Sequence, residues 1–180
     1  MRNQRTLSAL LVAAVVILGC RGSVSAQRSR VSPHETTTAT VDGSAMSIEY
    51  GRPSTRGRTI FGRLVAYGDV WCPGADEATM LTTSRPLHIG PLAVPAGEYS
   101  LWILPTETEW TLIVNKEAHT FHTNYRGSRD LGRVMLQKRT LTAPVEQLTF
   151  AIEQSSSGAG GRIVMSWATT EVSAPFMVGD

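Results

Sequence analysis

The residue types that could support chemistry gather in one stretch, residues 50–79 (YGRPSTRGRTIFGRLVAYGDVWCPGADEAT). Guanidinium groups form paired hydrogen bonds with phosphate, sulfate or carboxylate groups, so its arginines form a candidate anion site, in which we single out Arg52 and Arg58. The alternative is structural, because arginines that bind backbone carbonyls or nearby carboxylates would fix a long loop on a sheet. The near balance of charge favours this second interpretation. The stretch holds four arginines: Arg52, Arg56, Arg58 and Arg63.

Asp76 and Glu77 are the acidic pair of this stretch. Neighbouring residues of a strand point to opposite faces, so on a strand the two carboxylates could not act together as acid and base on one substrate. In a turn they could. We expect one of them to form a salt bridge with an arginine of the same stretch, and we keep both as candidate binding residues.

Other potential catalytic or metal-binding groups lack the partners that such sites need. Cys72 is predicted to be a small buried residue, because nothing in the sequence selects a histidine as its base. His119 and His122 have a spacing of three, which suits a turn but not one face of a strand, and no cysteine or carboxylate stands at ligand spacing beside them. There is also no G-x-S-x-G motif. We predict no metal, no cofactor and no catalytic residue.

The aromatic side chains divide into candidates for the core and candidates for contact. Tyr67 and Trp71 lie in the irregular stretch, and we interpret them as an exposed contact for a ligand or a protein. Trp102, Trp110 and Trp167 lie on strand patterns and are expected in the core.

The start of the chain has the pattern of an export signal. Two arginines precede an unbroken small and apolar run of thirteen residues at 7–19, which is short for a spanning helix of roughly 20 residues. We assign residues 1–20 to a signal or anchor and residues 21–33 to a linker. Lipidation of Cys20 is favoured, because this cysteine ends the apolar run directly; cleavage after Val24-Ser25-Ala26 and an uncleaved anchor remain open. We expect the domain on the periplasmic side of the cell envelope, anchored at the membrane.

The composition argues against nucleic acid as a partner. The chain has 17 basic and 15 acidic residues, and Arg2 and Arg5 belong to the signal, so 15 of each remain. A near-neutral domain lacks the basic surface that phosphate backbones require. Cys72 is the one cysteine beyond the signal, so no internal disulfide is expected.

The rest of the chain has the pattern of short strands separated by turns. Asp42-Gly43 is a strong hairpin signal, and the run 98–104 is apolar on both faces, which predicts a central strand covered on both sides. Eight to ten such strands, without an amphipathic helix, predict one all-β domain over residues 34–180, an antiparallel, jelly-roll-like β-sandwich. We expect Trp102, Trp110, Phe150 and Trp167 to point inward. The expected strands include 36–41, 45–50, 131–141, 146–153, 162–168 and 171–178, with a long loop at 116–130.

Several separated motifs follow one another along the chain: SPH at 32–34, YGRP at 50–53, GRTIFG at 57–62, YGDVW at 67–71, GADEAT at 74–79, PAGEYSL at 95–101 and WT at 110–111. In this order they resemble the bacterial family catalogued as domain of unknown function 2911, over about residues 34–176. The resemblance implies an exported all-β domain without an established activity. Where the family usually has Trp-Arg-Thr-Gly-Ala-Asn, this chain has WCPGAD at 71–76, and the missing arginine weakens the case for a shared anion site.

Two classes of function follow from these patterns. In the first, which we favour, the domain is not an enzyme and acts as an interaction or accessory subunit of a larger membrane-associated complex, bound to a protein partner through a strand edge or the 50–79 loop. In the second, it binds or hydrolyses a small anionic or carbohydrate ligand in a pocket under that loop.

Overall fold

The computed structural model of the chain describes residues 32–180. The expected signal, its Cys20 and all but the end of the expected linker lie outside the described residues. Within 32–180, no helix is long and apolar enough to cross a membrane.

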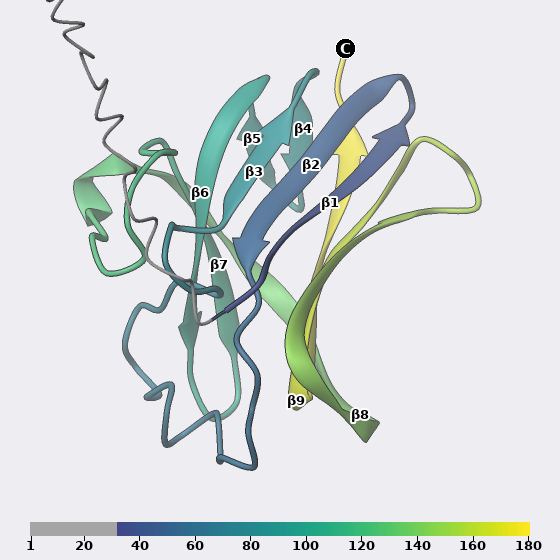
Figure 1. Cartoon of the computed structure of the whole chain (residues 1–180). Coiled ribbons are helices and arrows are strands. Elements are labelled where there is room, and N and C mark those ends of the chain that lie inside the picture. The colour runs from purple at the N-terminus through teal and green to yellow at the C-terminus, as the bar shows by residue number, and fades with distance from the viewer. Residues whose placement is uncertain (1–31) are drawn as a thin grey trace, which may run out of the picture.

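The described chain consists of antiparallel strands with a single short 3-10 helix (Figure 1). Every strand pairing is antiparallel, and the strands join in the order β1-β2-β3-β6-β7-β8-β9-β4-β5. The predicted all-β antiparallel fold is therefore confirmed. The elements are β1 (His34–Val41), β2 (Ser44–Gly51), β3 (Met80–Thr83), β4 (Leu87–Ile89), β5 (Leu92–Val94), β6 (Gly97–Pro105), β7 (Trp110–Asn115), η1 (Gly127–Arg129), β8 (Asp130–Gln154) and β9 (Gly160–Val178).

The sheet folds over on itself, so that β2 faces β8 across one main hydrophobic core. Figure 1 shows β8 and β9 as long arched ribbons that curve past the β1–β2 hairpin. The Tyr50 ring on β2 meets the Phe150 ring on β8 edge to face, with centroids 5.0 Å apart. Trp110 and Trp167 are fully buried in the same core, and Phe150 is also buried, as predicted.

Two of the predicted strand boundaries are wrong. Residues 131–141 and 146–153 belong to one strand, β8, and residues 162–168 and 171–178 belong to one strand, β9. The pairing of β8 with β9 shifts register between Thr140 and Thr149, and Ala168 has a positive φ of 51°. Such bulges bend a strand without ending it, so the breaks in alternation are bends and not turns.

The two-sided burial predicted for 98–104 is confirmed. On β6, Leu101 and Ile103 enter the main core, while Trp102 enters a second cluster with Cys72, Ala78 and Ile113. Cys72 and Ala78 come from the irregular stretch, which therefore covers the outer face of β6 and β7. Because burial of the large apolar Trp102 side chain is favourable, it stabilises the packing of the irregular stretch on this face.

Candidate functional site

Three isolated bridges attach the irregular loop between β2 and β3 to the rest of the domain. They pair Ser54 with Gln147, Trp71 with Ile103, and Glu77 with Phe121. The first tethers the loop to β8, the second to β6, and the third to the long loop between β7 and β8. The loop is thus an ordered part of the domain.

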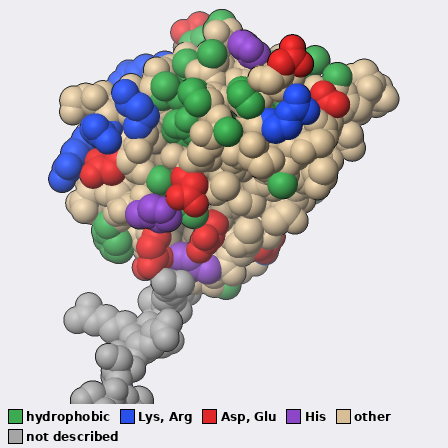
Figure 2. Space-filling model, turned by 90° about the horizontal axis from the view of Figure 1, so that it is seen from above, with side chains coloured by type: hydrophobic (Ala, Val, Ile, Leu, Met, Phe, Trp, Pro, Cys, Tyr) green, Lys and Arg blue, Asp and Glu red, His purple; other side chains and the backbone are tan. Residues whose placement is uncertain are grey.

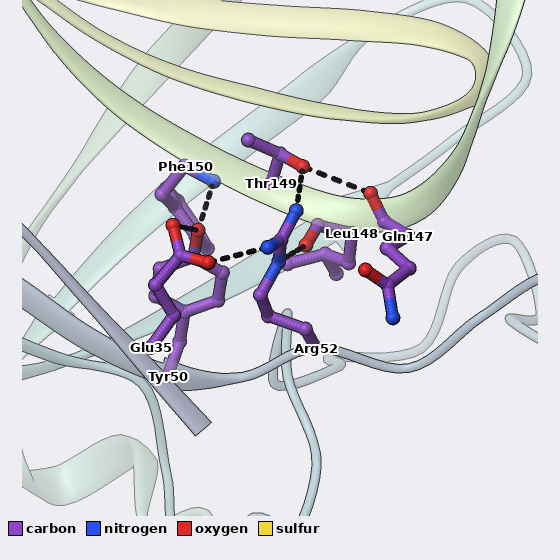
Figure 3. A network of polar contacts seen from close by, with 7 residues as sticks. All are labelled: Glu35, Tyr50, Arg52, Gln147, Leu148, Thr149 and Phe150. Carbon is purple, nitrogen blue, oxygen red and sulfur yellow. Dashed lines mark hydrogen bonds and ion pairs between the residues drawn. The ribbon is translucent and has the colours of Figure 1, made fainter. Parts of the chain in front are cut away.

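Arg52 holds β1, β2 and β8 together (Figure 3). Its Nε donates to the Leu148 carbonyl at 3.1 Å, its Nη2 donates to the Thr149 hydroxyl at 2.8 Å, and its Nη1 forms an ion pair with Glu35. The Tyr50 hydroxyl completes the network, because it donates to Glu35 and accepts from the Phe150 backbone N–H at 3.0 Å. Burial raises the pKa of this hydroxyl above its ordinary value.

The other singled-out arginine also has structural partners. Arg58 donates from Nε to the Thr55 carbonyl at 2.9 Å and from Nη2 to the Ser54 carbonyl at 2.7 Å. Arg52 and Arg58 therefore fix the loop through backbone carbonyls, as the structural interpretation expected.

The two predicted aromatic contacts differ in their surroundings. Tyr67 is exposed, as expected. Trp71 is half-buried, and its ring stacks on Trp167 with centroids 5.9 Å apart and an angle of 14° between the ring planes. Trp71 is less exposed than predicted, because the backbone bridge to Ile103 turns its side chain toward the core.

The carboxylates of Asp76 and Glu77 both lie close to one histidine, His34, which is not part of the irregular loop. His34 Nε2, at the start of β1, lies 3.5 Å from Asp76 Oδ2 and 3.2 Å from Glu77 Oε2. Asp76 has a φ of 68°, a left-handed conformation that Asp tolerates better than most residues, so the pair occupies a turn and both carboxylates reach one side. The partner expected from sequence was an arginine of the same stretch; the structure places the His34 ring against both carboxylates.

Backbone contacts fix this turn on both sides. The Asp76 carbonyl accepts from the His122 N–H at 3.0 Å, and Ala78 N–H donates to the Thr120 carbonyl at 2.9 Å. On the other side the Ala75 carbonyl packs onto Gly51, where a Cβ would lie only 2.3 Å from that oxygen. Glycine at 51 is what allows the loop to close over the end of β2.

A surface pocket of about 410 Å³ opens beside this turn. Its volume lies within the roughly 300–1,000 Å³ typical of ligand sites. The end of the irregular loop, the starts of β1 and β3, the end of β2 and the β7–β8 loop contribute the lining. The lining residues are His34, Glu49, Tyr50, Glu77, Ala78, Met80, Ala118, His119, Thr120, Phe121 and Asn124.

The pocket is acidic. Two glutamates, Glu49 and Glu77, line it, and among residues 32–180 no lysine or arginine belongs to the lining. His34 faces the acidic pair, and His119 Nε2 lies 2.9 Å from Glu98 Oε2. Figure 2 shows acidic and histidine side chains gathered on the side of the molecule where the described chain begins.

Of the predicted binding residues, the structure places only Glu77 in the lining of this pocket. Asp76 is outside the lining but lies close to His34, which does line the pocket. The other predicted binding residues are also absent from the lining: Arg52, Arg58, Tyr67 and Trp71. Sequence reasoning missed Glu49 and Phe121. Glu49 could have been proposed from the sequence, because it is a polar residue on the outer face of a strand and lies close to a motif. No sequence pattern, in contrast, places Phe121 beside Glu77.

Cys72 and Ser100, whose side chains could in principle act as nucleophiles, are both buried in the packed domain. Cys72 is almost fully buried, and burial raises the pKa of its thiol to about 12. Ser100 is buried and accepts from the Trp102 indole N–H at 2.8 Å. In the part of the chain from Ser32 onward, no group of three or more His, Cys, Asp or Glu is arranged to hold a metal ion.

Comparison with known proteins identifies the family. No match is found among curated proteins or among solved structures. The family described as "Protein of unknown function (DUF2911)" matches residues 32–176, which include every strand up to most of β9. The chain therefore belongs to this family.

Proposed function

We propose that this protein is a non-catalytic domain of the cell envelope that acts as an accessory subunit, docking on a protein partner at the membrane surface through the acidic pocket. The observation that supports this most is the position of the pocket. His34 lines it and lies two residues after the first described residue, so the pocket is close in sequence to the segment that has the pattern of an export signal.

The length of that segment keeps the pocket near an anchor. A fully extended chain spans at most about 3.3–3.6 Å per residue, so a lipidated Cys20 would hold His34 within about 50 Å of the membrane surface. A partner embedded in or attached to the same membrane is then within reach of the pocket.

The surroundings of the reactive groups support a non-catalytic role. The Cys72 thiol, with its pKa raised to about 12, is a poor nucleophile at neutral pH. Arg52 and Arg58 hold backbone carbonyls and do not line the pocket. An anionic ligand, the alternative from sequence, therefore receives less support than a partner with complementary positive charge.

The test is co-purification from detergent-solubilised membranes with the full-length chain as bait. The Glu49→Gln/Glu77→Gln variant should lose a partner that the wild type retains, and Cys20→Ala should move the protein to the soluble fraction. The matched control is Glu107→Gln/Glu109→Gln, which removes two exposed carboxylates from the β6–β7 turn. If the Glu49→Gln/Glu77→Gln variant retained the partner as well as the wild type and the control variant do, docking through the pocket would be contradicted.

A further inference from the structure

A patch of basic side chains lies where the two ends of the loop between β7 and β8 meet. The buried Asn115 side chain holds this junction together, because its Nδ2 donates to the Arg126 carbonyl and to Asp130 Oδ1, both at 2.9 Å. The Lys116 N–H donates to the Arg129 carbonyl at 2.9 Å and closes the loop at η1. The cations are therefore carried by a fixed part of the backbone. The basic patch consists of Lys116, Arg126, Arg129 and Arg133, all of them exposed.

The basic patch keeps an excess of positive charge after its own ion pairs are counted. Glu117 pairs with Arg126, with 3.2 Å between Oε1 and Nη1. Asp130 pairs with Arg133, with 3.0 Å between Oδ2 and Nη2. In the part of the chain that the structure describes, no carboxylate forms an ion pair with the other two cations of the patch. The remaining 31 residues contain five arginines and no acidic residue, so they cannot supply one.

The described domain as a whole has the opposite charge. Of the 17 basic residues, five lie in residues 1–31, which leaves 12 against all 15 acidic residues in residues 32–180. Figure 2 shows lysine and arginine side chains gathered on the left of the molecule, the side on which η1 lies in Figure 1. A domain with net negative charge is repelled by an anionic surface except through its basic face, so this distribution of charge favours one orientation.

An anionic membrane surface fits the basic patch. Four exposed cations, two of them already paired with acids, suit a surface with many separate negative charges better than a single anion in a closed site. Anionic lipids attract Lys and Arg side chains, but the attraction falls off within a Debye length of roughly 8 Å at physiological ionic strength. The expected anchor at the start of the chain would keep the domain at the membrane, where an attraction of such short range is effective.

We propose that the basic patch lies on anionic lipid headgroups and thereby orients the domain on the membrane. Residues 118–121 and Asn124, in the middle of the same loop, line the acidic pocket. This orientation therefore brings the pocket close to the membrane surface, where the proposed partner is located. The inference rests on the proposed function for the presence of the domain at the membrane, but the lipid contact itself is measured without any partner.

The experiment places full-length protein in nanodiscs that contain a trace of lipid with a paramagnetic headgroup, and measures the broadening of backbone amide NMR signals. One set of discs contains phosphatidylcholine alone, and the other contains equal parts of phosphatidylcholine and phosphatidylglycerol. Signals of residues 116 and 126–129 should broaden by roughly twofold or more in the anionic discs, and high salt should abolish this gain because it shortens the Debye length. Signals of residues 155–159, on the opposite side of the molecule in Figure 1, should not respond to the lipid.

Two charge-matched variants separate the effect of the basic patch from that of net charge. Lys116→Gln/Arg129→Gln should reduce the gain in broadening to less than about half, because it removes the two cations that form no ion pair within residues 32–180. Arg56→Gln/Arg63→Gln removes the same charge at two exposed positions of the irregular loop and should leave the gain unchanged. The amide spectrum of the other residues verifies that both variants are folded.

Three outcomes would overturn the assignment to anionic lipid. The first is equal broadening of the patch signals in the two kinds of disc, and the second is an equal effect of the two variants. The third is a joint shift of the patch signals and those of residues 49 and 77 as the protein concentration rises in neutral detergent. That shift would show that the acidic pocket of a second copy occupies the basic patch.

The lipid contact and the accessory role fail separately. If the basic patch responds to anionic lipid but no partner depends on the acidic pocket, the accessory role fails and the orientation stands. If a partner is lost on mutation of the pocket but the patch does not distinguish the two lipids, the orientation fails and the accessory role stands. Protein that leaves the discs altogether would contradict both, since both place the domain at the membrane.

Discussion

His34 Nε2 lies 3.2 Å from Glu77 Oε2, which joins the first residue of β1 to the last turn of the irregular loop. The same two side chains line the acidic pocket. The point where the domain begins and the loop that covers β6 therefore meet at one site. A change at either end of this contact alters both the entry of the chain into the domain and the shape of the pocket.

Arg52→Ala should lower the free energy of unfolding by about 2–3 kcal/mol, because it removes charge-assisted hydrogen bonds that join β2 to Leu148, Thr149 and Glu35. Arg52→Lys should recover only part of this, since an ammonium cannot reproduce the planar fork. Urea unfolding measures both. Arg63→Ala, at an exposed loop position, should change stability by less than about 0.5 kcal/mol. If Arg52→Ala lowered the free energy of unfolding as little as Arg63→Ala does, Arg52 would not have the structural role assigned to it.

Trp71→Ala should destabilise the domain by about 2–4 kcal/mol, because it removes a half-buried ring stacked on Trp167. Tyr67→Ala, at the exposed position on the same loop, should cost less than about 1 kcal/mol. Thermal unfolding of the two variants side by side makes the comparison. Similar losses in both would mean that Tyr67 is part of the packed structure.

Local patterns in the sequence predict much of the fold. The hairpin at Asp42-Gly43 is confirmed because both residues have the positive φ that their types favour, 46° and 73°. The two-sided burial of β6 is confirmed because apolar residues occupy both phases of its alternation. In β8, Pro144 and its neighbours break the alternation, but the strand continues because the break falls where pairing with β9 is interrupted.

The site depends on contacts that local patterns do not encode. Glu77 meets His34 and Phe121 only because three separate segments converge at the end of β2. Trp71 turns inward because Ile103 pairs with its backbone, a relation between residues far apart in the chain. Sequence alone identified the acidic pair as candidates but could supply neither its partner nor its pocket.

Cys72 should resist alkylation in the folded protein, because burial raises the pKa of its thiol to about 12. At pH 8 the native chain should incorporate about a tenth or less of the iodoacetamide that the urea-unfolded chain takes up in the same time. Mass spectrometry of the peptide that contains Cys72 separates this signal from any at Cys20. Equal labelling of the native and unfolded chains would contradict the buried environment.

The free energy of unfolding should fall at low pH, in part because Glu171 becomes protonated. Its hydrogen bonds from Arg139, at 2.5 and 2.7 Å, hold the pKa of this carboxyl below its ordinary value of about 4.5. Because the unfolded chain then takes up the proton first, the contribution of Glu171 is present at neutral pH and is lost as the pH falls through the lower, folded pKa. Glu171→Gln should therefore be less stable than wild type at pH 7, and the difference should narrow below about pH 4.5. A difference that stays constant from pH 7 to pH 3 would contradict this linkage.

The most direct test of docking through the acidic pocket is site-specific photocross-linking in living cells that produce the full-length chain. A benzophenone amino acid replaces Phe121 at the pocket rim, and in a second version it replaces Met135, an equally exposed apolar residue on β8. We predict a discrete protein adduct from position 121 that is lost when Glu49→Gln/Glu77→Gln is added, with no such adduct from position 135. The absence of an adduct at 121, or the same adduct from both positions, would contradict the account.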